Sequence, residues 1–342
     1  MKNKIIVTGG CGYIGSHTVI ELIENNYTVI ILDDLSNSTE ETLHRIEKIT
    51  NVKPSFINID LKDELKTKKV FKEHKDAKAV INFAAHKAVG ESVQKPLMYY
   101  KNNLYSLINT LTALTENTIN GFIFSSSATV YGTPKSLPIT EQSKTQRPFS
   151  PYGNTKKIAE EIIDDLIKSE TNLSAISLRY FNPIGAHESG LIGELPSGIP
   201  NNLMPYITQT AAGIREKLMV YGNDYPTKDG TPIRDYIHVV DLAKAHVLAV
   251  ERIIKNQQEK PFEIFNLGTG NGFSVLDIIK SFEEVTNSKL NYEITDRRPG
   301  DVPKLYASID LVKDKLGWKP SKSLNEMIKS SWDWERKLND KS

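Results

Sequence analysis

The ten residues TGGCGYIGSH, positions 8–17, connect a run of β-branched residues to a segment with the apolar spacing of a helix. Gly9, Gly12 and Gly15 lie three residues apart, and Gly10 completes a G-x-G-x-x-G spacing with the last two. A tight turn from strand to helix often uses glycine, so the spacing alone is weak support for a binding site. The flanking strand and helix strengthen it, because glycines there let the backbone approach a pyrophosphate at the helix N-terminus. The stretch therefore predicts a dinucleotide site.

A carboxylate ends the next predicted strand, TVIILD, residues 28–33. In a dinucleotide site a carboxylate at this spacing accepts hydrogen bonds from the adenosine ribose hydroxyls and would repel a 2′-phosphate. Asp33 therefore predicts NAD rather than NADP as the cofactor, although a turn residue could also stand there. Asp60, at the end of the third predicted strand, is placed to reach the adenine, but a simple cap fits its spacing nearly as well.

Short β-branched runs alternate with longer amphipathic segments through the first half of the chain. Strands that alternate with helices form a parallel sheet covered on both faces. We therefore predict an α/β fold, a Rossmann-type doubly wound parallel sheet with a smaller, discontinuous α/β substrate domain. The predicted strands are 4–9, 28–34, 54–60, 77–85, 121–127 and 174–181, and the predicted helices lie within 16–26, 105–117 and 151–168.

The composition and periodicity of the sequence change after Phe181. Residues 182–202 are rich in glycine and proline and show neither a strand nor a helix period, so we expect them to cover a substrate. The chain is then expected to return to the sheet through 235–251 and 262–268, and the charged tail WERKLNDKS (334–342) to be a solvated helix end. The predicted domains are an NAD-binding domain of 1–181 plus about 237–267, and a substrate-binding domain of about 182–236 plus 268–342.

Composition excludes several classes of protein. The 342 residues include 43 basic and 42 acidic side chains, a net charge of +1, so no overall field attracts nucleic acid or an anionic membrane. The single cysteine, Cys11, excludes an intramolecular disulfide, and no apolar run approaches the roughly 18 residues that span a bilayer. The N-terminus lacks the apolar core of a signal peptide. We expect a soluble, cytoplasmic protein with a small-molecule substrate and no metal, nucleic-acid or membrane partner.

The segment SPYGNTK, residues 150–156, places Tyr152 and Lys156 one helical turn apart. Pro151 suits the first turn of a helix, so the two side chains could simply be neighbours on one helix face. Beside a nicotinamide they gain a chemical role, because an ammonium and a nicotinamide cation both favour the ionised form of a phenol. Lowering the usual pKa of about 10 by roughly three units would suit the phenol to acid–base work near neutrality.

Three consecutive serines, Ser125 to Ser127, end another predicted strand. The carboxyl ends of strands are where parallel α/β sheets bind ligands. One of these hydroxyls could relay a proton and orient a substrate alcohol, and Ser127 lies furthest along the strand. A turn or capping role is more common for any single serine, so this assignment depends on the rest of the chain.

Eight segments carry a resemblance over nearly the whole length: VTGGCGYIGSHT (7–18), VINFAAHKAVGESVQKPL (80–97), FIFSSSATVYG (122–132), SPYGNTK (150–156), LRYFNPIGAH (178–187), GIPNNLMPYI (198–207), YGNDYPTKDGTPIRDYIHVVDLA (221–243) and RRPGD (297–301). In this order they resemble the extended short-chain dehydrogenase/reductases, and within these the UDP-glucose 4-epimerase family. The resemblance implies an NAD-dependent isomerase of galactose metabolism, which inverts C4 of UDP-glucose and UDP-galactose through a transient 4-keto sugar. It also implies a homodimer.

The resemblance further implies roles for single residues. Tyr152 would be the acid–base catalyst, Ser127 its hydrogen-bonding helper, and Lys156 the group that binds the nicotinamide ribose and lowers the pKa of the tyrosine. Besides these three, the implied cofactor-binding residues are Gly9, Gly12, Tyr13, Ile14, Gly15, Asp33, Asp34, Leu35, Ser36, Asn37, Ser38, Asp60, Leu61, Phe83, Ala84, Ala85, His86, Lys87, Asn102 and Phe181.

A second implied set would bind the UDP-sugar together with Ser127 and Tyr152. Its two arginines can each offer a planar fork of donors to a diphosphate, although either could be a surface ion-pair residue. Leu305 is implied as a gate beside the C2 substituent of the sugar, where a bulky residue excludes an N-acetyl group, but it could also simply fill a gap. The set is Asn182, Asn202, Leu203, Met219, Val220, Tyr221, Arg234, Arg298, Pro299, Gly300, Asp301 and Leu305.

The sequence departs from the family pattern in the cofactor region and leaves alternatives open. Ala85 and His86 stand where Gly-Leu is expected, and Asp34 where asparagine is common, which affects details of NAD contact. One alternative is an epimerase that also accepts UDP-N-acetylhexosamines. Another is a nucleotide-sugar 4,6-dehydratase, but Ala128 and Thr129 replace the Asp-Glu pair expected in such enzymes. A non-catalytic NAD-sensing protein would have no use for the serine, tyrosine and lysine together.

Overall fold

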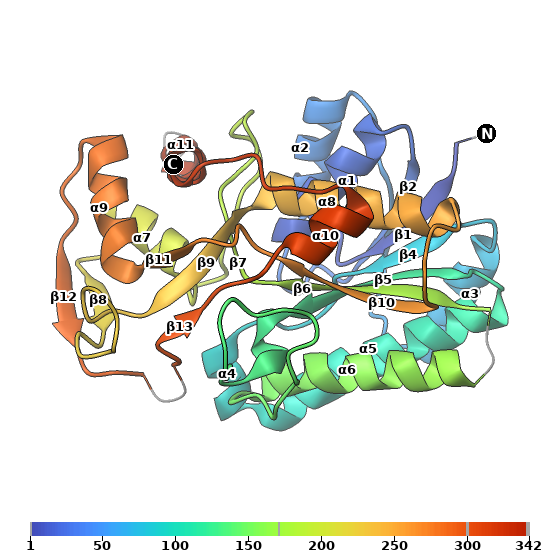
Figure 1. The fold of residues 1–342 in the computed structure, drawn as a ribbon. Helices are drawn as coiled ribbons and strands as arrows, with labels where there is room; N and C mark the ends of the chain where they lie inside the picture. Colours follow the sequence, from blue (N-terminus) through green and yellow to red (C-terminus); the bar gives the residue numbers. More distant parts are fainter. Residues whose placement is uncertain (1, 170–171, 299–300, 340–342) are drawn as a thin grey trace. The chain divides into compact units, whose positions relative to one another are not determined.

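The computed structural model describes residues 2–169, 172–298 and 301–339, and Figure 1 shows the fold. The chain divides into two compact units. The first unit consists of Met1–Gly132, Lys144–Tyr180 and Ala243–Phe265, and the second of Thr133–Ser143, Phe181–Leu242 and Asn266–Ser342. Each unit is therefore discontinuous in sequence.

The first unit is built around a seven-stranded sheet. Its strands are β1 (Lys4–Thr8), β2 (Thr28–Asp33), β3 (Ser55–Asn58), β4 (Ala79–Asn82), β5 (Gly121–Ser127), β6 (Ser174–Tyr180) and β10 (Phe262–Leu267). They follow the order β10-β6-β5-β4-β1-β2-β3, and the neighbouring pairs from β6 to β3 are parallel. Ile5, Ile6 and Val7 of β1 are fully buried, because helices cover both faces of such a sheet. The predicted doubly wound parallel sheet is confirmed.

Helices lie on both faces of this sheet, α5 and α6 along one face and α1 and α8 along the other (Figure 1). Helix α6 starts where the sequence indicates, since Pro151 occupies its first turn and the Ser150 hydroxyl accepts a hydrogen bond from the Gly153 N–H at 3.1 Å. The helices are α1 (Tyr13–Glu24), α2 (Glu41–Thr50), α3 (Glu64–Glu73), α4 (Val89–Gln94), α5 (Pro96–Glu116), the 3-10 turn η1 (Ala128–Tyr131), α6 (Pro151–Lys168) and α8 (Val239–Ile254), which enters this unit at Ala243.

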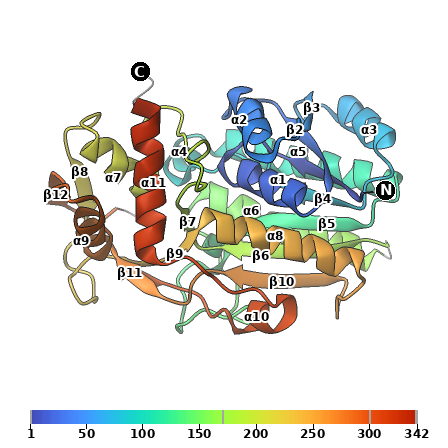
Figure 2. The same cartoon turned by 90° about the horizontal axis from the view of Figure 1, so that it is seen from above.

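The second unit has its own small sheets and its own core. The elements are β7 (Asn182–Ile184), α7 (Leu203–Ala211), β8 (Leu218–Tyr221), β9 (Ile233–His238), β11 (Gly272–Ser274), α9 (Val275–Thr286), β12 (Tyr292–Thr295), β13 (Lys304–Leu305), α10 (Asp310–Leu316) and α11 (Leu324–Asn339). Strand β9 pairs with β7, β11 and β13, while β8 pairs with β12. Figure 2 shows α11 beside α7 and α9, where Ile278, Phe282 and Ile328 are fully buried.

Two expectations about this part of the chain need correction. Strand β9 (Ile233–His238) overlaps the segment 235–251 that was expected to return to the large sheet, but it belongs to a sheet of the second unit. Of the two expected segments, only the one that forms β10 adds a strand to the large sheet. The C-terminal helix is not simply solvated either, because Trp334 and Glu335 are buried. The Trp334 indole donates to the Glu194 carbonyl at 3.0 Å, and Glu335 accepts from the Thr208 hydroxyl at 2.8 Å.

Across residues 2–169, 172–298 and 301–339, no helix combines the length and the apolar character required to cross a lipid bilayer.

Candidate active site

The turn between β1 and α1 can be built only with glycine at two of its positions. Gly9 has a φ of +69°, and a Cβ there would lie 2.7 Å from the Ala84 nitrogen. A Cβ on Gly15 would lie 2.2 Å from the Gly9 carbonyl oxygen, which is an impossible contact. The Gly9 N–H donates to the Leu32 carbonyl at 2.7 Å and so fixes the turn against β2. The loop therefore has the close backbone approach that a bound pyrophosphate requires.

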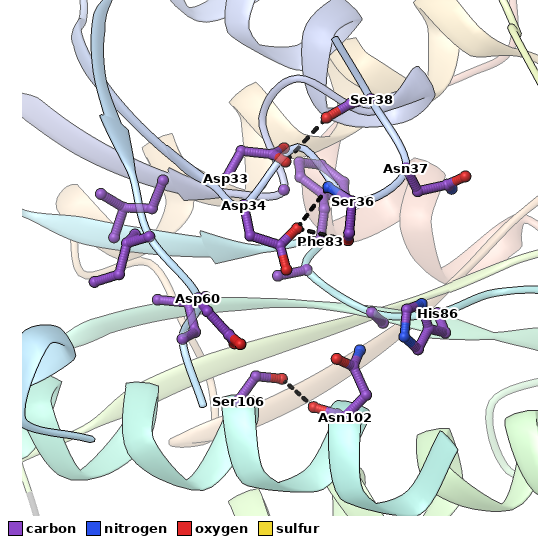
Figure 3. A pocket seen from close by; sticks show the side chains of 16 residues that line it. Asp33, Asp34, Ser36, Asn37, Ser38, Asp60, Phe83, His86, Asn102 and Ser106 are labelled. Carbon is purple, nitrogen blue, oxygen red and sulfur yellow. Dashed lines mark hydrogen bonds between the residues drawn. The ribbon is translucent and has the colours of Figure 1, made fainter. Parts of the chain in front are cut away.

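The carboxyl ends of β1, β2, β3 and β4 meet at a pocket in the first unit (Figure 3). The strand order reverses between β1 and β4, which is the place where open α/β sheets bind ligands. Of the predicted cofactor-binding residues, the pocket brings together Gly9, Asp33, Asp34, Ser36, Asn37, Ser38, Asp60, Leu61, Phe83, Ala84, Ala85, His86 and Asn102.

Asp33 is the most constrained carboxylate of the pocket. One oxygen accepts from the Cys11 N–H at 2.9 Å, and the other from the Leu35 N–H and the Ser38 hydroxyl, each at 3.0 Å. Burial raises the pKa of Asp33, and these hydrogen bonds oppose that rise. Next to it, Asp34 accepts from both the N–H and the hydroxyl of Ser36, as Figure 3 shows. The loop after β2 thus presents carboxylate oxygens to the pocket in fixed positions.

On the other side of the pocket, Lys62 connects the end of β3 to α5. Its ammonium lies 2.9 Å from an Asp60 oxygen and donates to the Asn102 side chain at 2.8 Å. Burial disfavours the charge of Asp60, but the hydrogen bonds and charge of Lys62 outweigh it and lower the pKa of Asp60. Burial, aided by Lys62, lowers the pKa of His86, so this imidazole is neutral at pH 7. His86 points into the pocket from the loop after β4 (Figure 3).

Several predicted cofactor residues do not line this pocket. Gly12, Tyr13, Ile14 and Gly15 form the start of α1, Leu35 lies in the loop after β2, and the Lys87 ammonium lies 5.7 Å from the Tyr13 ring centroid. Phe181 falls in the second unit, where its N–H donates to the Leu267 carbonyl.

Sequence reasoning missed three residues that do line the pocket, Leu32, Ile59 and Ser106. Ser106 follows Asn102 by one helical turn and donates to its carbonyl at 2.7 Å (Figure 3), so the helical period of α5 could have indicated it. Leu32 and Ile59 each directly precede a predicted carboxylate. An apolar residue at a strand end carries no signal of its own.

The three predicted catalytic residues come together in the same unit. Ser127 is the last residue of β5, and the Tyr152 hydroxyl at the start of α6 is hydrogen-bonded to it. Lys156 follows one turn later, is 4% exposed, and donates to the Ser125 carbonyl at 2.6 Å. Its ammonium also lies 4.9 Å from the Phe124 ring centroid. A phenol, a hydroxyl and a buried cation thus converge at the carboxyl end of β5.

Burial acts against the charged forms of both titrating groups. It raises the pKa of Tyr152 to about 12, although the hydrogen bond with Ser127 opposes the rise. It lowers the pKa of Lys156 to about 7, opposed by the negative charge of Glu160. Burial therefore opposes the lowering of the tyrosine pKa that is expected from Lys156, and this role of Lys156 stays a prediction. A positively charged nicotinamide beside this phenol would favour its ionised form.

In the second unit, two predicted arginines converge on one predicted carboxylate. Arg234 lies on β9, is mostly buried, and its guanidinium is 3.4 Å from Asp301. Arg298 donates from Nε to Asp301 at 3.0 Å, and its guanidinium lies 4.9 Å from the Tyr221 ring centroid. Two cations around one anion leave a net positive charge beside an exposed aromatic face. This is suitable for an anionic, ring-containing ligand.

The other predicted substrate residues are distributed over the elements of this unit. Asn182 begins β7 and pairs with Tyr236. Asn202 occupies the N-cap position of α7 without a side-chain capping bond, and its amide donates to Glu194 at 2.6 Å. Leu305 pairs with Arg234 in the parallel β13–β9 ladder. Leu203 begins α7, and Met219, Val220 and Tyr221 lie on β8. Pro299 and Gly300 lie outside the described residues.

Comparison with known proteins agrees with this geometry. The family model described as GDP-mannose 4,6 dehydratase matches residues 6–331. The chain is 50% identical over 337 residues to a UDP-glucose 4-epimerase of Drosophila melanogaster, which covers 97% of this chain and 96% of the relative.

Solved structures are similar over the whole length. The UDP-glucose 4-epimerase of Stenotrophomonas maltophila, with bound NAD and formylated UDP-arabinopyranose, has a TM-score of 0.96 at 43% identity and covers 100% of both chains. That of Bifidobacterium longum, in complex with NAD+ and UDP, has a TM-score of 0.94 at 45% identity and covers 99% of both. The resemblance predicted from the motifs is confirmed. The chain therefore belongs to the family that the GDP-mannose 4,6 dehydratase model describes and, within it, to the UDP-glucose 4-epimerases.

Proposed function

We propose that this protein interconverts UDP-glucose and UDP-galactose by inverting C4 of the hexose. The observation that carries the proposal is the Ser127–Tyr152 hydrogen bond beside the buried ammonium of Lys156, on a scaffold of the epimerase family. The Tyr152 oxygen takes the proton of the C4 hydroxyl, and Ser127 orients that hydroxyl. Bound NAD would supply the hydride acceptor and donor that inversion of C4 through a transient 4-keto sugar requires. Tyr152 then gives the proton back.

The first unit supplies the residues that would hold NAD. The glycine turn would leave room for the pyrophosphate, and Asp33 would accept hydrogen bonds from the adenosine ribose, which favours NAD over NADP. Lys156 would donate to the nicotinamide ribose in addition to the Ser125 carbonyl. The cofactor prediction agrees with the Stenotrophomonas and Bifidobacterium relatives, which were solved with NAD or NAD+.

The second unit supplies the residues that would hold UDP. Arg234 and Arg298 would bind the diphosphate in place of, or together with, their contacts to Asp301. Asn182 and Asn202 can pair with phosphate or uracil, and Tyr221 presents an exposed ring. Inversion requires the sugar to turn while its anchor stays in place. Most specific groups are therefore expected to address UDP and few the hexose.

A 4,6-dehydratase shares the first oxidation but needs a second acid–base group to eliminate water across C5 and C6. The two positions after Ser127 are Ala128 and Thr129, and neither can transfer that proton. The Thr129 hydroxyl instead donates to the Ser127 oxygen at 2.9 Å. This contact fixes the hydroxyl that would orient the substrate, while the residue types at positions 128 and 129 favour the epimerase over the dehydratase.

Purified protein incubated with UDP-galactose tests the proposal. Because the hydride returns in every cycle, we expect conversion to UDP-glucose without added NAD and without release of NADH. Tyr152→Phe keeps the ring and removes the proton-carrying oxygen, so its rate should fall at least about 100-fold at unchanged NAD content. Steady NADH release would indicate a dehydrogenase, and a variant with more than about a tenth of the wild-type rate would remove Tyr152 from its role.

We also propose that the protein is a cytoplasmic homodimer. Leu97, Tyr105 and Ile108 expose 81%, 54% and 44% of their surface along α5, and apolar side chains gathered on one helix face are typical of an interface. Sedimentation at micromolar concentration should give the mass of two chains. A single-chain mass for the wild type would contradict the dimer.

A further inference from the structure

A buried carboxylate close to the predicted catalytic residues accepts several hydrogen bonds, although no catalytic role is assigned to it. Glu160 lies on α6, one turn after Lys156, and is 6% exposed. One of its oxygens accepts from the Ser126 hydroxyl at 2.6 Å and from the Ser177 hydroxyl at 2.7 Å. Arg179 donates to both oxygens, from Nε at 3.0 Å and from a terminal nitrogen at 2.6 Å.

The strand register explains why these groups meet. Ser126 of β5 pairs with Arg179 of β6, and Ser177 lies two residues earlier on β6, so all three side chains face α6. Arg179 also donates to the Tyr131 hydroxyl at 2.9 Å, and Tyr131 ends the turn η1. Glu160 and Arg179 thus connect α6, β5, β6 and η1.

Two of these elements, β5 and α6, carry the predicted catalytic residues. Ser126 lies between Ser125, whose carbonyl accepts from Lys156, and Ser127, which is hydrogen-bonded to Tyr152. The hydrogen-bond network formed by Glu160, Arg179 and the two serines therefore fixes the end of β5 relative to α6, close to the reacting groups.

Stability alone does not account for an ion pair in this place. Removing two charges from water costs several kcal/mol, and apolar pairs of similar volume are often as stable or more stable. Ala175, on the same face of β6, and Ile163 of α6 show that this layer accommodates fully buried apolar side chains. An ion pair fixes the geometry of the elements that it joins more strictly than an apolar pair does, because its hydrogen bonds are directional and are satisfied in only one register.

We propose that Glu160 and Arg179 are positioning residues, which hold Ser127 in register with Tyr152 and Lys156 for proton transfer. The inference rests on the proposed function and extends it to residues that do not touch the substrate. Its consequence is that the catalytic rate depends on the network more strongly than folding does.

Two serines provide the sharpest test, because both donate to the same oxygen of Glu160 and both are fully or almost fully buried. Only Ser126 adjoins Ser127. Ser126→Ala and Ser177→Ala should therefore lose similar unfolding free energy. A small misplacement of reacting groups can lower a rate by up to about 100-fold, so we expect Ser126→Ala to lower kcat about tenfold or more. KM for UDP-galactose and NAD content should be nearly unchanged, and Ser177→Ala should lower kcat much less.

The ion pair itself is tested with a matched control in the same unit. Arg252 and Glu263 form another buried pair, at 2.6 Å and 2.8 Å, between α8 and β10. The double variants Glu160→Leu/Arg179→Met and Arg252→Met/Glu263→Leu should both fold, but only the first should lose kcat.

Equal kcat losses in the two serine variants, or full kcat in Glu160→Leu/Arg179→Met, would overturn the positioning role while leaving the epimerase proposal intact. If the double variant does not fold, the serine pair decides. A wild-type protein without epimerase activity would instead overturn the proposed function, and the positioning role with it.

Discussion

Burial acts on Tyr152 and Lys156 in opposite directions. It raises the pKa of the phenol to about 12 and lowers the pKa of the ammonium to about 7, so each group tends toward its neutral form in the protein chain alone. The sequence identifies these residues by their spacing and motifs. It does not predict the sign of the net shift, because desolvation depends on how completely the surrounding elements cover each group.

The titration of Tyr152 should depend on the redox state of the cofactor. A positive nicotinamide favours phenolate, whereas the reduced ring is neutral, so the pKa of Tyr152 should be lower with NAD+ than with NADH. Phenolate absorbance, measured against pH with Tyr152→Phe subtracted to remove the other tyrosines, should therefore rise at lower pH in the NAD+ form. Identical titrations in the two forms would show that the cofactor charge does not act on this phenol.

Leu305 is predicted to limit the size of the C2 substituent. Overpacking a rigid site costs roughly 1 to 3 kcal/mol, which corresponds to about 5- to 150-fold in rate. We expect a preference for UDP-glucose and UDP-galactose over their N-acetylated forms. Leu305→Ser, which shortens the side chain on β13, should raise the relative kcat/KM for the N-acetylated sugars. An unchanged ratio in the variant, or equal wild-type values for both sugar types, would remove Leu305 as the gate.

At the scale of elements, the sequence predicts best the strands that are buried on both faces, because they form continuous apolar runs. Strands β1, β2, β4 and β5 are of this kind. Helix α2 is absent from the predicted helices, although Leu43, Ile46 and Ile49 recur every three residues along it and Ile46 is buried. The pattern of β9 is the same whichever sheet it joins, because the choice depends on distant partners on β7, β11 and β13. The contacts of Trp334 and Glu335 are long-range in the same way.

The start of α6 is an element whose integrity should matter for catalysis. The Ser150 hydroxyl accepts from the Gly153 N–H, and Tyr152 lies within the turn that this cap closes. Ser150→Ala should cost about 1 kcal/mol of unfolding free energy and loosen that turn, so kcat should fall by more than the stability loss explains.

The cap of α9 provides the control for this variant. The Ser274 hydroxyl accepts from the Asp277 N–H at 3.1 Å, and α9 carries none of the predicted site residues. Ser274→Ala also removes the hydrogen bond that this hydroxyl donates to Asp229, so it should show at least as large a loss in chemical denaturation, but without the loss of kcat. Equal kcat in both variants would mean that fraying at Ser150 does not reach Tyr152.

For the whole molecule, the alternation of strands with helices predicts the doubly wound sheet. The change in composition and periodicity after Phe181 indicates where the second unit resumes. The association of Thr133–Ser143 with that unit leaves no sign in the sequence. It depends on Ile139, whose N–H donates to the Tyr306 carbonyl at 3.0 Å and whose backbone bridges to Ala307. Pairing between such distant segments is decided by packing, not by local preference.

The central claim is that one hydride leaves C4 and returns to the same carbon from the other side. UDP-galactose carrying deuterium at C4 tests this directly, with the product analysed by NMR and mass spectrometry. We predict UDP-glucose that retains the deuterium at C4. Loss of the label to water would contradict hydride transfer, and deuterium at C6 of a 4-keto-6-deoxy sugar would show that the protein is a dehydratase.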